Sequence, residues 1–176
     1  METTGVVRRI DDLGRVVIPK EIRRTLGIKD GTSLEIFVEQ DMVALKKHSS
    51  MNNLSHFAEV YVESIYNTLK RDVIITDRDN VIAVAGCLKK EYLMKPISNY
   101  LEGCINKRIN VMQKEMKELN IIDDKREYCS CVINTIISNG DSIGSVIILS
   151  LEDNIGELEE KTAQIASQFL GKHIEE

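Results

Sequence analysis

The stretch that decides the fold of the first part of the chain reads Gly5-Val6-Val7-Arg8-Arg9-Ile10-Asp11-Asp12-Leu13-Gly14-Arg15-Val16-Val17-Ile18-Pro19. Its aliphatic runs predict strands at residues 5–10 and 15–18, and the Asp- and Gly-containing segment between them is typical of a turn. Working outward, a short helix is predicted from Pro19, which suits a first helical position, to Gly27, which suits a left-handed cap. Alternating residues at 33–38 and a return at 43–47, around Gln40-Asp41, predict two more strands. The predicted order is ββαββ.

This first unit, residues 1–47, is too small to stand alone. It has one aromatic residue, Phe37, and none of its residues is a cysteine, so neither a large core nor a disulfide is available. Two intertwined copies would bury the aliphatic faces of both and pair their edge strands. We therefore predict a mainly β swapped-hairpin domain that forms a homodimer.

The remainder of the chain is predicted to be a separate α+β domain. The polar residues 48–53 are interpreted as a linker, and residues 54–176 follow as the second domain. Apolar stripes at helical spacing run from Leu54 to Leu69 and from Ile155 to Leu170. Strands are predicted at 73–76, 81–85, 129–137 and 142–149, the last two joined by an Asn139-Gly140-Asp141 hairpin turn, and helices at 98–108 and 110–119. The domain should contain an antiparallel sheet with long terminal helices.

Charge is distributed unevenly between the two predicted domains. Residues 1–50 carry nine Lys/Arg against eight Asp/Glu, whereas residues 51–176 carry fourteen against twenty. A local basic cluster decides where phosphate binds, and guanidinium groups reach phosphates and guanine edges bidentately. The candidate DNA-binding residues are Arg8, Arg9, Arg15, Lys20, Arg23 and Arg24. The alternative is that these are solvated charges, some of them paired with Asp11, Asp12 or Glu21.

Residues 4–28, continued by 34–38 and 45–47, resemble the AbrB-type transition-state regulators of spore-forming bacteria. The resemblance implies a dimeric swapped-hairpin domain that binds double-stranded DNA, with the family's DNA-contacting arginines at Arg8, Arg15, Arg23 and Arg24. With the second domain included, the chain resembles sporulation regulators of this family in which a GAF-like domain follows. That resemblance implies a homotetramer joined by helical bundles, acting as both activator and repressor. Because the sequence shows neither a signal peptide nor a membrane-spanning run, the protein is expected in the cytoplasm, associated with the nucleoid. Because related swapped-hairpin domains serve as antitoxins, a protein-binding module of that kind is the alternative.

The second domain offers few groups for chemistry. A small-molecule effector pocket would be lined by Tyr92, Tyr100, Cys104 and Tyr128, with ordinary core packing as the alternative for each. Asn106-Lys107 is not followed by the phenylalanine of the GAF domains that bind cyclic nucleotides. Cys129-Ser130-Cys131 has no second Cys or His pair at zinc spacing, so no metal is expected. Without a catalytic constellation, a cofactor motif or a membrane span, we expect no enzyme, no cofactor and no membrane contact.

Overall fold

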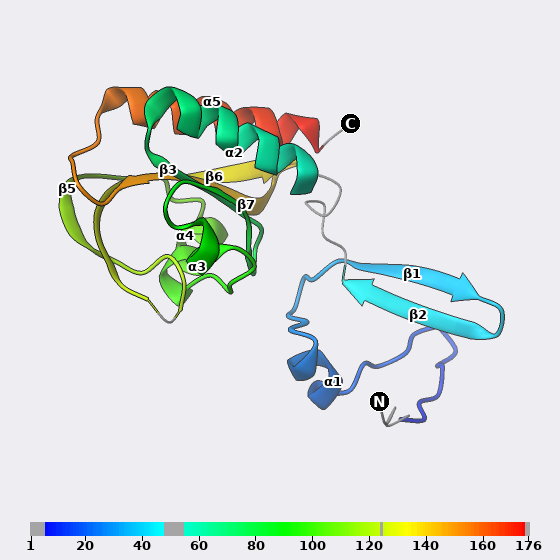
Figure 1. The fold of residues 1–176 in the computed structure, drawn as a ribbon. Helices are drawn as coiled ribbons and strands as arrows, with labels where there is room; N and C mark the ends of the chain where they lie inside the picture. The colour runs from blue at the N-terminus through cyan, green and yellow to red at the C-terminus, as the bar shows by residue number, and fades with distance from the viewer. Residues whose placement is uncertain (1–5, 48–54, 124, 175–176) are drawn as a thin grey trace. The chain divides into compact units, whose positions relative to one another are not determined.

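The computed structural model describes residues 6–47, 55–123 and 125–174 (Figure 1). The chain separates into two compact units, Met1–His48 and Ser49–Glu176. The predicted linker, residues 48–53, lies outside the described residues, as do Met1–Gly5, where the first predicted strand begins.

The N-terminal unit contains the predicted helix and the second predicted hairpin. Helix α1 spans Lys20–Thr25, begins after Pro19 and ends before Gly27, whose φ of +62° is the expected left-handed conformation. Strands β1 (Leu34–Glu39) and β2 (Met42–Lys47) pair antiparallel, with Glu39 opposite Met42. The Gln40-Asp41 turn and the strands around it are therefore confirmed.

The first predicted hairpin is only partly present. Residues 11–14 form the predicted turn, closed by hydrogen bonds from the Asp11 N–H to the Arg15 carbonyl (3.1 Å) and from the Gly14 N–H to the Asp11 carbonyl (3.0 Å). Residues 6–10 and 15–18, however, are not strands in this single chain, so that prediction is wrong for it. The reason is physical, because a strand needs a neighbouring strand to satisfy its backbone groups, and none of the described residues supplies one.

The N-terminal unit has no core of its own within the residues described. None of residues 6–46 is buried. Leu26, which follows α1, is exposed, as are most aliphatic residues of the two strands. The apolar surface that the sequence provides is therefore left uncovered by one copy of the unit.

The C-terminal unit is built on a five-stranded antiparallel sheet with the order β4-β3-β7-β6-β5. The strands are β3 (Asp72–Thr76), β4 (Val81–Ala85), β5 (Val111–Leu119), β6 (Glu127–Ser138) and β7 (Asp141–Ser150). Four of them were predicted. The turn between β6 and β7 has left-handed conformations at Asn139 and Gly140, as the Asn-Gly pair predicts.

Helices cover both faces of this sheet (Figure 1). Helices α2 (Ser55–Leu69) and α5 (Glu157–His173) pack on one face, over a core that includes Val62, Val132 and Leu170. The shorter helices α3 (Lys89–Tyr92) and α4 (Asn99–Lys107) pack on the other, around Leu101, Ile105 and Ile133. The predicted α+β architecture with long terminal helices is confirmed.

Two details of the C-terminal unit differ from the prediction. Residues 110–119 are not a helix, because Val111–Leu119 pairs with β6 as the edge strand β5. Its Met, Gln, Lys, Glu and Leu residues favour helix intrinsically, and pairing within the sheet overrides that preference. The apolar stripe of α5 is also only partly buried. Ala166 and Leu170 face the sheet, whereas Leu158, Ile165 and Phe169 are exposed.

Candidate nucleic-acid interface

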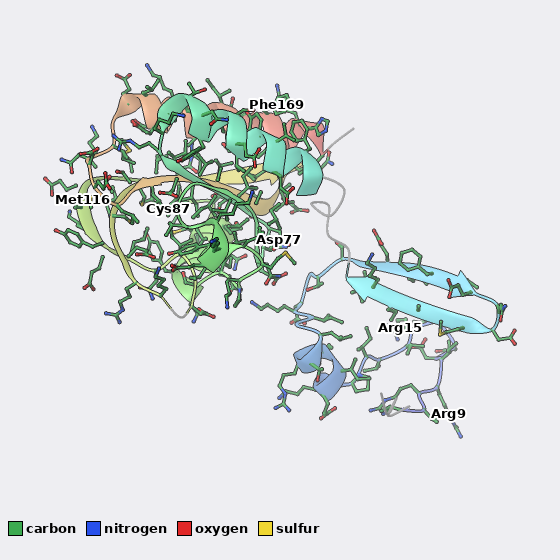
Figure 2. All side chains as sticks on the ribbon, viewed as in Figure 1. Arg9, Arg15, Asp77, Cys87, Met116 and Phe169 are labelled. Atoms are coloured by element: carbon green, nitrogen blue, oxygen red, sulfur yellow. The ribbon has the colours of Figure 1, made fainter. Side chains whose placement is uncertain are left out.

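Arg15 is held by the turn that precedes it. The Asp11 carboxylate accepts hydrogen bonds from the backbone N–H groups of Leu13 (3.1 Å) and Arg15 (2.7 Å), and the Arg15 Nε donates to the same carboxylate at 2.8 Å. These bonds, led by the Arg15 backbone N–H and followed by its guanidinium, lower the pKa of Asp11 below its usual range. Asp11 is therefore ionised near neutral pH and fixes both the turn and the Arg15 side chain. Figure 2 shows Arg15 and Arg9 on the segment before α1.

Helix α1 contributes three more cationic side chains. Lys20 and Arg24 are exposed, and neither forms an ion pair within the described part of the chain. The Arg23 Nη1 lies 3.7 Å from the fully exposed Asp30 Oδ1. The Arg23 Nε is buried and has no hydrogen-bond partner among the described residues. Arg23 therefore keeps an unused donor.

The ion pairs of Arg15 and Arg23 do not prevent these two side chains from binding another anion. Both arginines and both carboxylates lie at the surface, where such pairs contribute little and exchange readily with other anions. Arg8 and Arg9 are exposed as well. All six predicted residues thus belong to one small unit, on the segment before α1 and on α1 itself, and all keep guanidinium or ammonium groups within reach of solvent.

The β1–β2 hairpin has an apolar face that one copy of the chain leaves open. Side chains alternate along the strands, so cross-strand pairs such as Ile36–Leu45 and Val38–Val43 stand on the same face. Their exposed fractions are 68% for Ile36, 74% for Val38, 66% for Val43 and 45% for Leu45. The sequence indicated this face as apolar, but only the structure shows that nothing in the described part of the unit covers it.

The four predicted effector-pocket residues do not meet in one cavity. Tyr92 is fully buried, with its hydroxyl donating to the Glu127 Oε1 at 3.2 Å, and Cys104 is buried on the inner side of α4 itself. Tyr128 is exposed on β6. Tyr100 alone of the four lines an open cleft of about 530 Å³. Burial and, second, the neighbouring Cys104 raise the pKa of Tyr100 to about 12, so its hydroxyl remains protonated.

The cleft has polar residues that the sequence did not single out. It is lined by Ser98, Asn99, Tyr100, Gln113, Glu118, Leu119, Asn120, Asp123 and Arg126. Most of them come from β5 and the segment after it, which we had predicted to be helical or had not assigned. Within the described residues, no cluster of His, Cys, Asp or Glu is arranged to hold a metal ion. None of the described helices has the length and apolar character needed to cross a bilayer.

Comparison with known proteins identifies both halves of the chain. Residues 53–175 match the family described as stage V sporulation protein T C-terminal, transcription factor. The chain is 46% identical over 178 residues to stage V sporulation protein T of Bacillus subtilis, covering the full length of both. The chain belongs to the stage V sporulation protein T family. This family is one of transcription factors, which are not enzymes, and membership makes the chain a transcription regulator of sporulation.

The N-terminal unit has relatives of its own outside that family. Residues 7–52 match the family described as antidote-toxin recognition MazE, bacterial antitoxin. Over 48 residues the chain is 56% identical to the transition state regulatory protein AbrB of Bacillus subtilis, which spans 27% of this chain and 50% of AbrB. Among solved structures, a type II free methionine-R-sulfoxide reductase from Thermoplasma acidophilum matches with a TM-score of 0.50 at 14% identity. It covers 69% of this chain and 94% of the reductase. That likeness concerns the fold alone.

Proposed function

We propose that the chain binds double-stranded DNA as a homodimer of its N-terminal units, through Arg8, Arg9, Arg15, Lys20, Arg23 and Arg24. The observation that supports this most directly is the coexistence, on one unit, of accessible cationic side chains and an uncovered apolar hairpin face. Pairing two copies covers the apolar face and doubles the number of cations in one rigid assembly. Arginine then supplies phosphate contacts and bidentate contacts to guanine.

The dimer is supported by the free energy that would be gained if a second copy buried the open hairpin face. Full burial of an aliphatic side chain contributes about 1.5–3 kcal/mol. The exposed fractions of Ile36, Val38, Val43 and Leu45 therefore correspond to about 4–8 kcal/mol per protomer that a second copy would recover. Residues 6–10 and 15–18 would at the same time gain the strand partners that they lack in one copy.

The DNA-binding proposal is tested by measuring binding and folding on the same samples of the full chain. Arg15→Ala and Arg24→Ala should each weaken DNA binding by about 1–3 kcal/mol, with an unchanged thermal unfolding midpoint. The matched control is Arg78→Ala, an exposed arginine of the C-terminal unit that donates to Asn106 Oδ1. Equal affinity for wild type, both variants and the control would reject this surface as the DNA interface.

We also propose that two such dimers join into a homotetramer through α2 and α5. The outward face of these helices carries exposed Val60, Leu158, Ile165 and Phe169, the last of which is labelled in Figure 2. The Tyr61 ring stacks on the Phe169 ring with centroids 5.6 Å apart, and the Phe57 ring lies tilted against Phe169 at 5.9 Å. An apolar stripe of this kind on two neighbouring helices suits a helical bundle with another copy. Linking two DNA-binding dimers would raise avidity by about 10²–10⁴-fold.

The last part of the proposal concerns how the tetramer regulates transcription. The tetramer is proposed to act in the cytoplasm on the nucleoid, activating or repressing according to where its sites lie relative to a promoter. A small effector bound by the C-terminal unit would alter the arrangement of the helices that join the dimers. Loss of DNA affinity after disruption of the α2–α5 surface, with the N-terminal dimer retained, is the expected result for such an assembly.

The second candidate is an antitoxin-like module, favoured by the match of residues 7–52 to the MazE family. A stoichiometric toxin would then co-purify with the full chain and compete with DNA for the N-terminal unit. A chain that purifies without such a partner and binds DNA would exclude this candidate.

A further inference from the structure

The open cleft of the C-terminal unit lies where α4 begins and β5 ends. Its volume of about 530 Å³ falls within the range of about 300–1,000 Å³ that holds small ligands. Ser98 connects the two sides, because its hydroxyl donates to the Asn120 carbonyl at 2.6 Å and accepts from the Leu101 N–H at 3.2 Å. These two hydrogen bonds therefore hold the start of α4 against the segment that follows β5.

The lining presents donors for an anion. The backbone N–H groups of Asn99 and Tyr100, at the start of α4, have no hydrogen-bond acceptor among the described residues, since the Ser98 hydroxyl serves Leu101. The Asn99 side-chain amide is also without a described partner. Arg126 adds a guanidinium to the same lining. Positive charge and free N–H groups at a helix start favour a carboxylate.

The same lining presents acceptors for a cation. Asp123 has no ion pair or hydrogen bond among the described residues. Glu118 is paired with Arg126, but at 3.6 Å and with both side chains largely exposed, so the pair exchanges easily with a ligand. Tyr100 and Leu119 supply the apolar part of the lining. Donors, acceptors and apolar surface thus occur in one small cleft.

We propose that this cleft binds a small zwitterion, a free α-amino acid with an apolar side chain. Its carboxylate is received by Arg126 and the α4 N–H groups, its ammonium by Asp123 and Glu118, and its side chain by Tyr100 and Leu119. This inference rests on the effector-sensing part of the proposed function and names the ligand class for it. A ligand with both charges uses both halves of the lining, whereas a simple carboxylate or amine leaves one half unpaired.

The experiment is isothermal titration calorimetry of the full chain with L-leucine and L-phenylalanine. Each is compared with its matched acid lacking the amino group, 4-methylpentanoate or 3-phenylpropanoate, and with its matched amine lacking the carboxylate, isopentylamine or phenethylamine. We expect at least one amino acid to bind with a Kd of about 1 mM or tighter and both of its analogues to bind at least about tenfold more weakly.

Two variants test which residues bind the carboxylate and the ammonium group of the amino acid. Arg126→Gln should weaken binding of the amino acid about tenfold or more, and Asp123→Asn should remove its advantage over the acid that lacks the ammonium group. Arg78→Gln, on an arginine outside the cleft, is the control and should bind as the wild type does.

Absence of heat with both amino acids, equal binding of amino acid and acid, or full binding by Arg126→Gln would each overturn the inference. DNA binding is measured on the same samples, so that failure of the ligand assignment can be told apart from failure of the proposed DNA-binding function. Loss of ligand binding with DNA binding intact contradicts the ligand assignment alone. Ligand binding by a chain that does not bind DNA contradicts the DNA-binding proposal alone.

Discussion

Ile36→Ser should separate paired N-terminal units. The Ile36 side chain is 68% exposed in one copy, so a partner that covers it gains about 1–2 kcal/mol per protomer. Two copies of the substitution in each dimer remove about 2–4 kcal/mol, which raises the dimer dissociation constant about 30- to 700-fold. The residue lies on the open hairpin face and opposite Leu45, so its replacement leaves the strand pairing of β1 and β2 within the protomer intact.

The dissociation constant is best measured by sedimentation equilibrium in a full chain that also carries Ile165→Ser, so that the α2–α5 surface does not hold copies together. Met94→Ser is the matched control, because Met94 is similarly exposed, at 72%, but belongs to neither proposed interface. The control should dissociate like the parent chain. A dissociation constant for Ile36→Ser within about twofold of the parent value would refute the idea that this face pairs two protomers.

Three further predictions concern the rest of the molecule. Ile165→Ser alone should convert a tetramer into dimers, visible as a halved mass in light scattering, whereas an unchanged tetramer would place the contact elsewhere. Gly171→Ala should destabilise the C-terminal unit by about 1–3 kcal/mol, because its Cβ would lie 2.1 Å from the Ile137 carbonyl oxygen. Gly103→Ala, with open space around it, should be neutral or stabilising by up to about 1 kcal/mol, and thermal unfolding compares the two. The lowered pKa of Asp11 means that its hydrogen bonds stabilise the turn above the unfolded-state pKa and are lost as pH falls through the lower folded value. The Leu13 and Arg15 amide resonances should therefore shift in acid in the wild type but not in Asp11→Asn.

Local chemistry made much of the fold predictable from sequence. Strand β4 has the predicted bounds, Val81–Ala85, because a short aliphatic run bordered by polar residues has few alternatives. The Asn139-Gly140 turn and the Gly27 cap follow from residues that tolerate left-handed backbone. In these places the amino acids themselves determine the backbone conformation.

Tertiary pairing explains what the sequence did not reveal. Strand β5 consists of helix-forming residues, yet its Gln113 side chain donates to the Cys129 carbonyl at 2.8 Å, where the register with β6 shifts. Because this segment was predicted to be a helix, the cleft that it borders was not predicted as a whole, and Tyr100 is the one residue of the predicted effector pocket that lines it. The cluster of basic residues, by contrast, is visible in the sequence itself, and its role in DNA binding stays a prediction.

Apolar periodicity also does not reveal what covers an apolar surface. It predicted aliphatic faces on the hairpin and on α5, but the same pattern serves a core within one chain and an interface between two. Ile36 and Ile165 are exposed in a single copy, so they do not belong to a core among the described residues of one chain. Residues 6–10 show the same limit, because strand propensity has no structural effect until a partner strand is present.

The most direct test of the central claim is the salt dependence of DNA binding by the full chain and by Arg15→Ala. The logarithm of the association constant should fall linearly with the logarithm of salt concentration, by about 0.9 for every phosphate neutralised. Each protomer of the variant lacks one guanidinium, so its slope should be shallower by about 0.9 per lost contact. A wild-type affinity that does not change with salt, or a variant with the same slope and affinity as the wild type, would contradict the claim that these arginines bind the DNA backbone.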